Sequence, residues 1–286
     1  MSRILVLALL STAFGPQTAC RTTEAPPAVA PIAVAGSPEA WARLHAGQSA
    51  RLERLARFTA RGSVLVDFTD DTGARLAERA EHRFWREAPD RAAVRLSKAG
   101  VGLSMTAWNG DRWWIMDESG DDVVLEIHDL GPDAGRTLLA PPLLVAMAGL
   151  SPYPEAMPAD FVRIGETYRF TMPEPGVDGG PSNAVLEVTT ENPQRGPRTI
   201  VRLSARTAPV RSSLTRFDSV EGRGRPPGDW ALMPGRIEVE RNDGEDRMVI
   251  TLDRPLADGE ISSRLFDLEA QIARSRPSVV RGRDLP

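Results

Sequence analysis

Histidine and carboxylate side chains are the first candidates for chemistry, because they carry protons and bind metals. The three histidines are His45, His82 and His128, and none forms an H-E-x-x-H pair. The sequence also lacks a G-x-S-x-G elbow, a Walker loop and a dinucleotide-binding glycine motif. His82 and Glu78 alternate onto the expected inward side of one strand. A hydrogen-bonded core histidine and a strand-edge acid beside an arginine are the favoured interpretations.

The sequence therefore predicts no catalytic residue, no metal site and no cofactor, and we expect that the protein is not an enzyme. Strands can bring distant carboxylates together, so a hydrolytic carboxylate pair stays an alternative that nothing in the sequence favours.

Cys20, the only cysteine, indicates a different kind of chemistry. A short positive segment, residues 1–3, precedes a 12-residue apolar stretch, 4–15. This stretch is shorter than the roughly 20 residues that span a bilayer but fits a signal peptide. Gln17-Thr18-Ala19-Cys20 resembles a bacterial lipobox, although Gln17 stands where that pattern prefers an aliphatic residue. We expect lipidation of Cys20; the alternative is an ordinary secreted protein with a stray cysteine.

The expected organisation follows from this start. Residues 1–19 form a lipoprotein signal peptide, and residues 20–36 comprise the lipidated cysteine and a Pro/Ala-rich tether. Residues 37–274 form one domain, and residues 275–286 form a flexible tail. The N-terminal lipid, with acyl chains such as palmitate, would anchor the protein in the bacterial cell envelope. Arg21 after the cysteine, rather than Asp, favours the outer membrane, facing the periplasm.

Composition narrows the class of protein further. The 286 residues include 35 Lys+Arg and 39 Asp+Glu, which gives a net charge of −4. A mildly acidic chain argues against a nucleic-acid partner. The hydrophobic fraction of 41% excludes a polytopic membrane protein and a wholly disordered chain. A single cysteine excludes an intramolecular disulfide framework.

The elements that follow the tether are mostly strands. Ser37-Pro38 begins an amphipathic helix with apolar residues at helical spacing. From Phe58 the period becomes two, and about six strands follow, up to residue 128. An apolar insertion, 137–150, contains Pro141-Pro142 and predicts short buried helices. Seven further strand signals follow, at 161–170, 184–189, 200–205, 214–220, 236–240, 248–252 and 261–268.

The predicted fold class is mainly β. A single antiparallel sheet of about 10–12 strands would have to curl, giving a half-open β-barrel. The N-terminal helix and short plug or lid helices would cover its concave face, leaving a hydrophobic cavity. The residues expected to line that cavity are Val64, Val66, Phe68, Phe84, Leu103, Met105, Leu138, Leu139, Leu143, Leu144 and Met147.

The order of these elements resembles the LolA/LolB-type lipoprotein-carrier fold over about residues 37–270. The resemblance rests on the segments ARGSVLVDF, RFWREAPDRAAVRL, LSMTAWNGDRWWIMD and DDVVLEI, on the insertion LLAPPLLVAMAGL, and on an ending that reaches SSRLFDL. It implies a half-barrel cavity that holds lipids or acyl groups without covalent chemistry. The predicted lipid anchor places the chain nearer to the membrane-bound receptor branch than to the soluble carriers.

These observations predict a membrane-anchored lipoprotein, a monomer, that binds a lipid or the acyl chain of a lipoprotein and takes part in lipid or lipoprotein transfer at the envelope. Its expected partners are a lipid or an acylated protein, and the membrane through its anchor. The alternative is a structural or interaction lipoprotein of the envelope, with a filled core and a protein partner.

Overall fold

The computed structural model describes residues 32–69, 73–129, 141–174, 182–193, 196–204, 210–241 and 246–282. The predicted signal peptide, Cys20 and most of the tether lie outside these residues, as do Leu138 and Leu139 of the expected cavity lining. None of the helices in the described ranges is long and apolar enough to cross a membrane.

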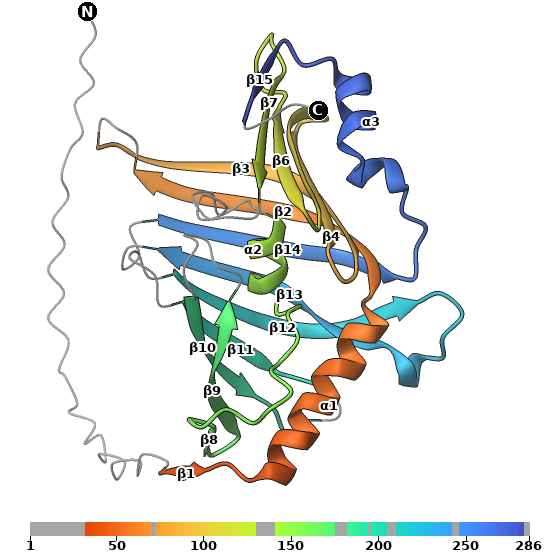
Figure 1. Ribbon diagram of the computed structural model, residues 1–286. Coiled ribbons are helices and arrows are strands. Elements are labelled where there is room, and N and C mark those ends of the chain that lie inside the picture. Colours follow the sequence, from red (N-terminus) through yellow and green to blue (C-terminus); the bar gives the residue numbers. More distant parts are fainter. Residues whose placement is uncertain are drawn as a thin grey trace, which may run out of the picture. The chain divides into compact units, whose positions relative to one another are not determined.

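The described strands form one sheet, in the order β1-β8-β9-β10-β11-β12-β13-β14-β2-β3-β4-β5-β6-β7-β15. Two antiparallel meanders, β8–β14 and β2–β7, join where β14 pairs with β2 (Figure 1). The strands are β1 (Ala33–Ala35), β2 (Arg57–Thr69), β3 (Arg75–Glu87), β4 (Arg91–Lys98), β5 (Val101–Asn109), β6 (Arg112–Asp117), β7 (Val124–Asp129), β8 (Val162–Ile164), β9 (Thr167–Glu174), β10 (Ser182–Thr189), β11 (Thr199–Ser204), β12 (Val210–Gly222), β13 (Ala231–Arg241), β14 (Asp246–Ala257) and β15 (Val279–Arg281).

In the part of the chain that the structure describes, three α-helices accompany the sheet: α1 (Pro38–Arg54), α2 (Pro141–Met147) and α3 (Leu268–Ser275). Short 3₁₀ turns η1 (Pro227–Asp229) and η3 (Ser263–Phe266) complete the described elements. The predicted start of α1 is confirmed, since Ser37 Oγ accepts a hydrogen bond from the amide of Ala40 at 3.2 Å. Figure 1 shows α1 and α2 against the sheet and α3 at the far end, beyond β4.

The sheet has two apolar faces rather than one. A large core on the concave face includes Trp41 of α1, Leu144 of α2 and Phe84 of β3. A smaller core on the opposite face includes Trp85, the next residue of β3, together with Phe266 of η3. Successive strand residues point to opposite faces, so β3 is buried on both sides at this position.

The predicted fold class is confirmed as a mainly β chain with one curved, unclosed sheet. The described residues form 15 strands rather than 10–12, because short strands border the sheet. Among these, β1 lies within the expected tether and β15 within the expected tail, and β15 pairs in parallel with β7. The strand predicted at 261–268 is wrong: η3 and the start of α3 occupy this segment, because Asp267 caps a helix by accepting from the amide of Ala270.

Candidate functional site

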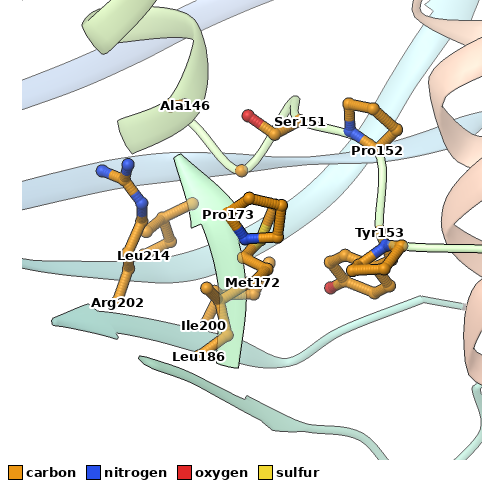
Figure 2. A pocket seen from close by; sticks show the side chains of 12 residues that line it. Ala146, Ser151, Pro152, Tyr153, Met172, Pro173, Leu186, Ile200, Arg202 and Leu214 are labelled. Carbon is orange, nitrogen blue, oxygen red and sulfur yellow. The ribbon is translucent and has the colours of Figure 1, made fainter. Parts of the chain in front are cut away.

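A cavity of about 350 Å³ lies beneath the C-terminal end of α2, between the turn of residues 149–154 and strands β9–β12. We call it the α2 cavity (Figure 2). Its walls are largely apolar, and its volume falls at the lower end of the range for ligand pockets. The residues that line it are Ala146, Gly149, Ser151, Pro152, Tyr153, Pro154, Met172, Pro173, Leu186, Ile200, Arg202 and Leu214.

Sheet register explains why the floor of the α2 cavity is apolar. Ile200 pairs with Leu214 on β12, and Leu186 pairs with Arg202 on β11. Paired residues share a face, so these four side chains point to the same side of the sheet. In Figure 2 they rise from neighbouring strands toward the end of α2.

Arg202 is a charged residue in this otherwise apolar floor. It is 5% exposed, and among the lining residues that the structure describes it is the only one with a charged side chain. Ser212 lies directly opposite it on β12 and is 1% exposed. The Oγ atom of Ser212 has no hydrogen-bond partner among the described residues. The cavity is thus apolar with a buried polar end.

Helix α1 holds the turn that closes the cavity. Gln48 Nε2 donates to the backbone oxygens of Gly149 and Ser151 at 3.1 and 2.9 Å. Arg51 donates from Nη1 to the oxygen of Gly149 at 2.7 Å and from Nε to the oxygen of Leu232 on β13 at 2.6 Å. These bonds tie the plug helix, its turn and the sheet to one turn of α1.

Burial shifts the pKa values of the two ionisable side chains at this turn, Arg51 and Tyr153. Arg51 is 3% exposed, and desolvation lowers the pKa of its guanidinium to about 10, still far above neutral pH. Burial raises the pKa of the Tyr153 phenol to about 12, with Arg51 acting in the opposite direction. Arg51 is therefore a cation and Tyr153 a neutral phenol at physiological pH.

Aromatic rings support the side of the cavity formed by Tyr153. The Tyr153 ring packs edge-on to Phe170 of β9, with centroids 5.0 Å apart. Trp41 of α1 contacts the same Phe170 ring at 5.0 Å, also edge-on. This packing fixes the turn against α1 and β9 on its far side.

The predicted lining residues on the first meander surround a much smaller space. Val64, Phe84 and Leu144 border a second cavity of about 30 Å³, roughly the volume of one water. Val66 packs against the same core, and Phe68 is half-buried. Leu143 and Met147 are buried in this core as well. In this half of the sheet, α2 fills the concave face with its own side chains.

Leu103 and Met105 do not belong to the concave face, so their assignment to the cavity lining is wrong. Met105 lies in the core of the opposite face, and Leu103 shares its side of β5 by alternation. Trp108 of the same strand packs on the concave core. Leu103 and Met105 looked inward-facing because η3 and its flanking residues bury the other face of this meander too.

The interpretation of His82 as a hydrogen-bonded core residue is confirmed. His82 is 6% exposed, and its Nε2 lies 2.8 Å from the oxygen of Thr251. Burial is the main reason that its pKa lies below the usual value. Glu78 is exposed and pairs with Lys98 at 2.8 Å. Within the described ranges, no group of three or more His, Cys, Asp or Glu side chains could hold a metal ion.

The sequence does not identify the floor of the α2 cavity as a site, although it carries one signal. Ile200, Arg202 and Ser204 alternate along a predicted strand, with an arginine among buried positions. An arginine on the buried side of a strand is uncommon and marks a position of interest. Tyr153 and Met172 carried no comparable pattern.

Comparison with solved structures shows which known proteins have a similar fold. A LolA superfamily protein from Nitrosomonas europaea superposes with a TM-score of 0.51 at 12% identity, over 80% of this chain and 97% of the other. The chain has a LolA-like fold. Two other solved structures were found, at TM-scores of 0.40 and 0.42. The first is a DUF1329 family protein from Desulfovibrio piger, 12% identical, which covers 80% of this chain and 98% of its own. The second is an outer membrane lipoprotein-sorting protein domain from Vibrio parahaemolyticus, 8% identical, which covers 79% and 95%.

No protein-family model matches the LolA-like chain, and no curated protein matches it either. The resemblance in the order of segments is supported by the similarity of fold, at 12% sequence identity.

Proposed function

We propose that this LolA-like protein is an envelope lipoprotein that holds the acyl chain of a lipid or of a lipoprotein in the α2 cavity and takes part in its transfer. The observation that carries the proposal is the largely apolar cavity of about 350 Å³ between the plug and β9–β12. Affinity would come from burying chain methylenes, at about 0.8 kcal/mol each. The proposal includes no covalent step, because a carrier needs only reversible burial.

The attachment of the plug supports a carrier role. Helix α2 has seven residues, and the turn after it is fixed by backbone hydrogen bonds from Gln48 and Arg51. A ligand chain longer than the cavity would have to displace this turn. Three hydrogen bonds hold this turn, each worth about 1 kcal/mol or more, so a ligand chain that buries several methylenes at about 0.8 kcal/mol each could offset their loss.

The test is to fill the α2 cavity and measure the lipid that the protein carries. The full chain, its Ile200→Trp variant and the matched control Leu203→Trp would be purified in parallel, and non-covalent lipid would be extracted and identified by mass spectrometry. Ile200 is buried on the cavity floor, whereas Leu203 lies on the same strand and is 47% exposed. We expect lipid with the wild type and Leu203→Trp and little with Ile200→Trp.

The opposite result has a clear meaning. Equal lipid in all three proteins, or none in the wild type, contradicts acyl binding in this cavity. It would favour the alternative of an envelope lipoprotein that acts through a protein partner.

The membrane anchor is a separate part of the proposal, and Cys20 is its proposed attachment point. Replacing Cys20 by Ser removes the thiol that acylation needs. Metabolic labelling with a palmitate analogue should mark the wild type and not the Cys20→Ser chain, and cell fractionation should find the wild type in the outer-membrane fraction. Equal labelling of both chains would contradict lipidation at this residue.

A further inference from the structure

The wall of the α2 cavity contains a tyrosine, Tyr153, whose hydroxyl group can recognise a ligand. We propose that this hydroxyl donates a hydrogen bond to the carbonyl oxygen of an ester-linked acyl chain held in the α2 cavity. The inference rests on the proposed function, because it names the class of acyl ligand for the same cavity and the residue that recognises it.

The first argument is the position of the hydroxyl. Tyr153 lines the α2 cavity and is only 7% exposed. In Figure 2 its hydroxyl oxygen points into the cavity, toward the side of Met172 and Leu186. No hydrogen bond joins this oxygen to another residue in the described ranges. Because buried hydroxyls normally have a partner, the proton of this one is available to a group held in the cavity.

The second argument is that the Tyr153 ring is held in place before a ligand binds. Phe170 packs edge-on to it, with centroids 5.0 Å apart, and the Trp41 ring lies at 6.3 Å. A donor that packing has already fixed loses little freedom on binding, so its hydrogen bond adds to the affinity. Burial raises the pKa of the phenol to about 12, so the hydroxyl keeps its proton at physiological pH.

The third argument concerns charge. Arg202 is the only charged residue in the described lining, and it already takes part in another interaction, so we do not count it as a ligand contact. A carboxylate that enters an apolar cavity without its own cation loses hydration at a large cost. An ester carbonyl has no net charge and accepts a hydrogen bond, which Tyr153 can supply. The cavity therefore favours an acyl ester over a free fatty acid.

The experiment compares ligands of similar length that differ in one group. The full chain carrying Cys20→Ser, which lacks the proposed anchor and serves as the parent, would be titrated with methyl decanoate, decyl methyl ether and decanoate at about pH 8. The ether has the chain length of the ester but no carbonyl, and decanoate carries a charge. One neutral hydrogen bond changes affinity about fivefold. We therefore expect the ester to bind about fivefold more tightly than the ether, and decanoate to bind more weakly than the ester.

Tyr153→Phe removes the hydroxyl and keeps the ring. This variant should bind the ester and the ether equally, with the affinity for the ether unchanged from the parent. Tyr168→Phe is the matched control, because Tyr168 is the other tyrosine of the chain, is 6% exposed and does not line the cavity. It should leave all three affinities unchanged.

Infrared spectroscopy tests the contact directly. The stretching frequency of an ester carbonyl falls when its oxygen accepts a hydrogen bond, and an isotope label separates its band from those of the protein. Bound methyl decanoate should absorb at a lower frequency in the parent than in Tyr153→Phe, and Tyr168→Phe should match the parent. The parent band should also lie below that of the ester dissolved in hexane, a comparison that needs no variant.

The outcomes separate the two proposals. If none of the three ligands binds, the proposed function fails. If the parent binds the ester and the ether equally, if Tyr153→Phe keeps the preference, or if the bound carbonyl absorbs as in hexane, acyl binding stands and the role of Tyr153 is wrong. Binding of decanoate at least as tight as that of methyl decanoate overturns the ester as the ligand class.

Discussion

Gly149, in the turn after α2, lies so close to Leu214 on β12 that a Cβ atom at Gly149 would be 2.9 Å from Cδ2 of Leu214. The same Cβ would be 3.2 Å from Cδ1 of Ile200. The backbone of this turn thus rests directly on two side chains of the cavity floor. Gly149 also has a φ of +68°, which residues with a side chain rarely adopt.

Gly149→Ala should therefore destabilise the protein by about 2–3 kcal/mol, from backbone strain and from the contact with Leu214. The matched control is Gly165→Ala. Gly165 has a φ of +61°, but a Cβ there meets nothing within 4 Å, so only the strain of about 1 kcal/mol remains. Urea unfolding of both variants gives the difference. Equal destabilisation would show that the turn does not press on the floor.

Arg51→Met tests the attachment of this turn to α1. The variant loses the hydrogen bonds from Arg51 to the oxygens of Gly149 and Leu232, but the methionine keeps part of the apolar stem. Two part-buried carbonyls left with one partner fewer should cost about 2–4 kcal/mol of unfolding free energy. Hydrogen exchange should speed up most at amides 148–151. Arg43→Met, on the exposed side of the same helix, should change stability by less than about 0.5 kcal/mol.

The sequence predicted much of the fold, because local signals agreed with it. Ser37-Pro38 located the start of α1, and the alternation from Phe58 onward located the first meander. The run 137–150 indicated the plug, of which α2 is the described helix. These features depend on neighbours in the chain, so a single sequence is enough to find them.

The position of the cavity was not predictable in the same way. Apolar alternation identifies a buried side of a strand but not which side when both are buried, as with Phe84 and Trp85. This is why Met105 was assigned to the wrong face. Helix α2 could pack on the part of the concave face near Val64 or on the part near Ile200. Which part it fills depends on the turn at Gly149 and on the contacts of this turn with α1, and these contacts join residues too distant in sequence for a local pattern to predict.

His82 predicts a pH dependence of stability. Its pKa in the folded state lies below the unfolded value of about 6.5, chiefly because burial disfavours the charged ring, while the oxygen of Thr251 and the charge of Asp253 act in the opposite direction. The unfolded chain therefore binds the proton first as the pH falls. The stability present above the unfolded pKa is lost as the pH falls from about 7 through the folded pKa, by at most about 1.4 kcal/mol per pH unit.

Urea unfolding between about pH 7.5 and pH 5 measures this loss. Carboxylates with a lowered pKa, such as Glu238, take up protons only below this pH range. His82→Gln should flatten the dependence, because the variant has no titrating ring. The same slope in wild type and variant would assign the pH dependence to another group.

The two halves of the concave face should respond differently to the same truncation. Leu144→Ala acts where the existing space is about 30 Å³, and Leu186→Ala acts at the cavity of about 350 Å³. Leu144 is buried and borders only this small space, so its removal should cost about 3–4 kcal/mol from lost transfer energy and an enlarged void. Leu186 already borders empty space on one side and has fewer contacts to lose, so the cost should be about 2 kcal/mol. Thermal or urea unfolding of both variants without ligand gives the comparison. A greater loss at Leu186 would mean that the α2 cavity is packed in solution, and binding there would lose its physical basis.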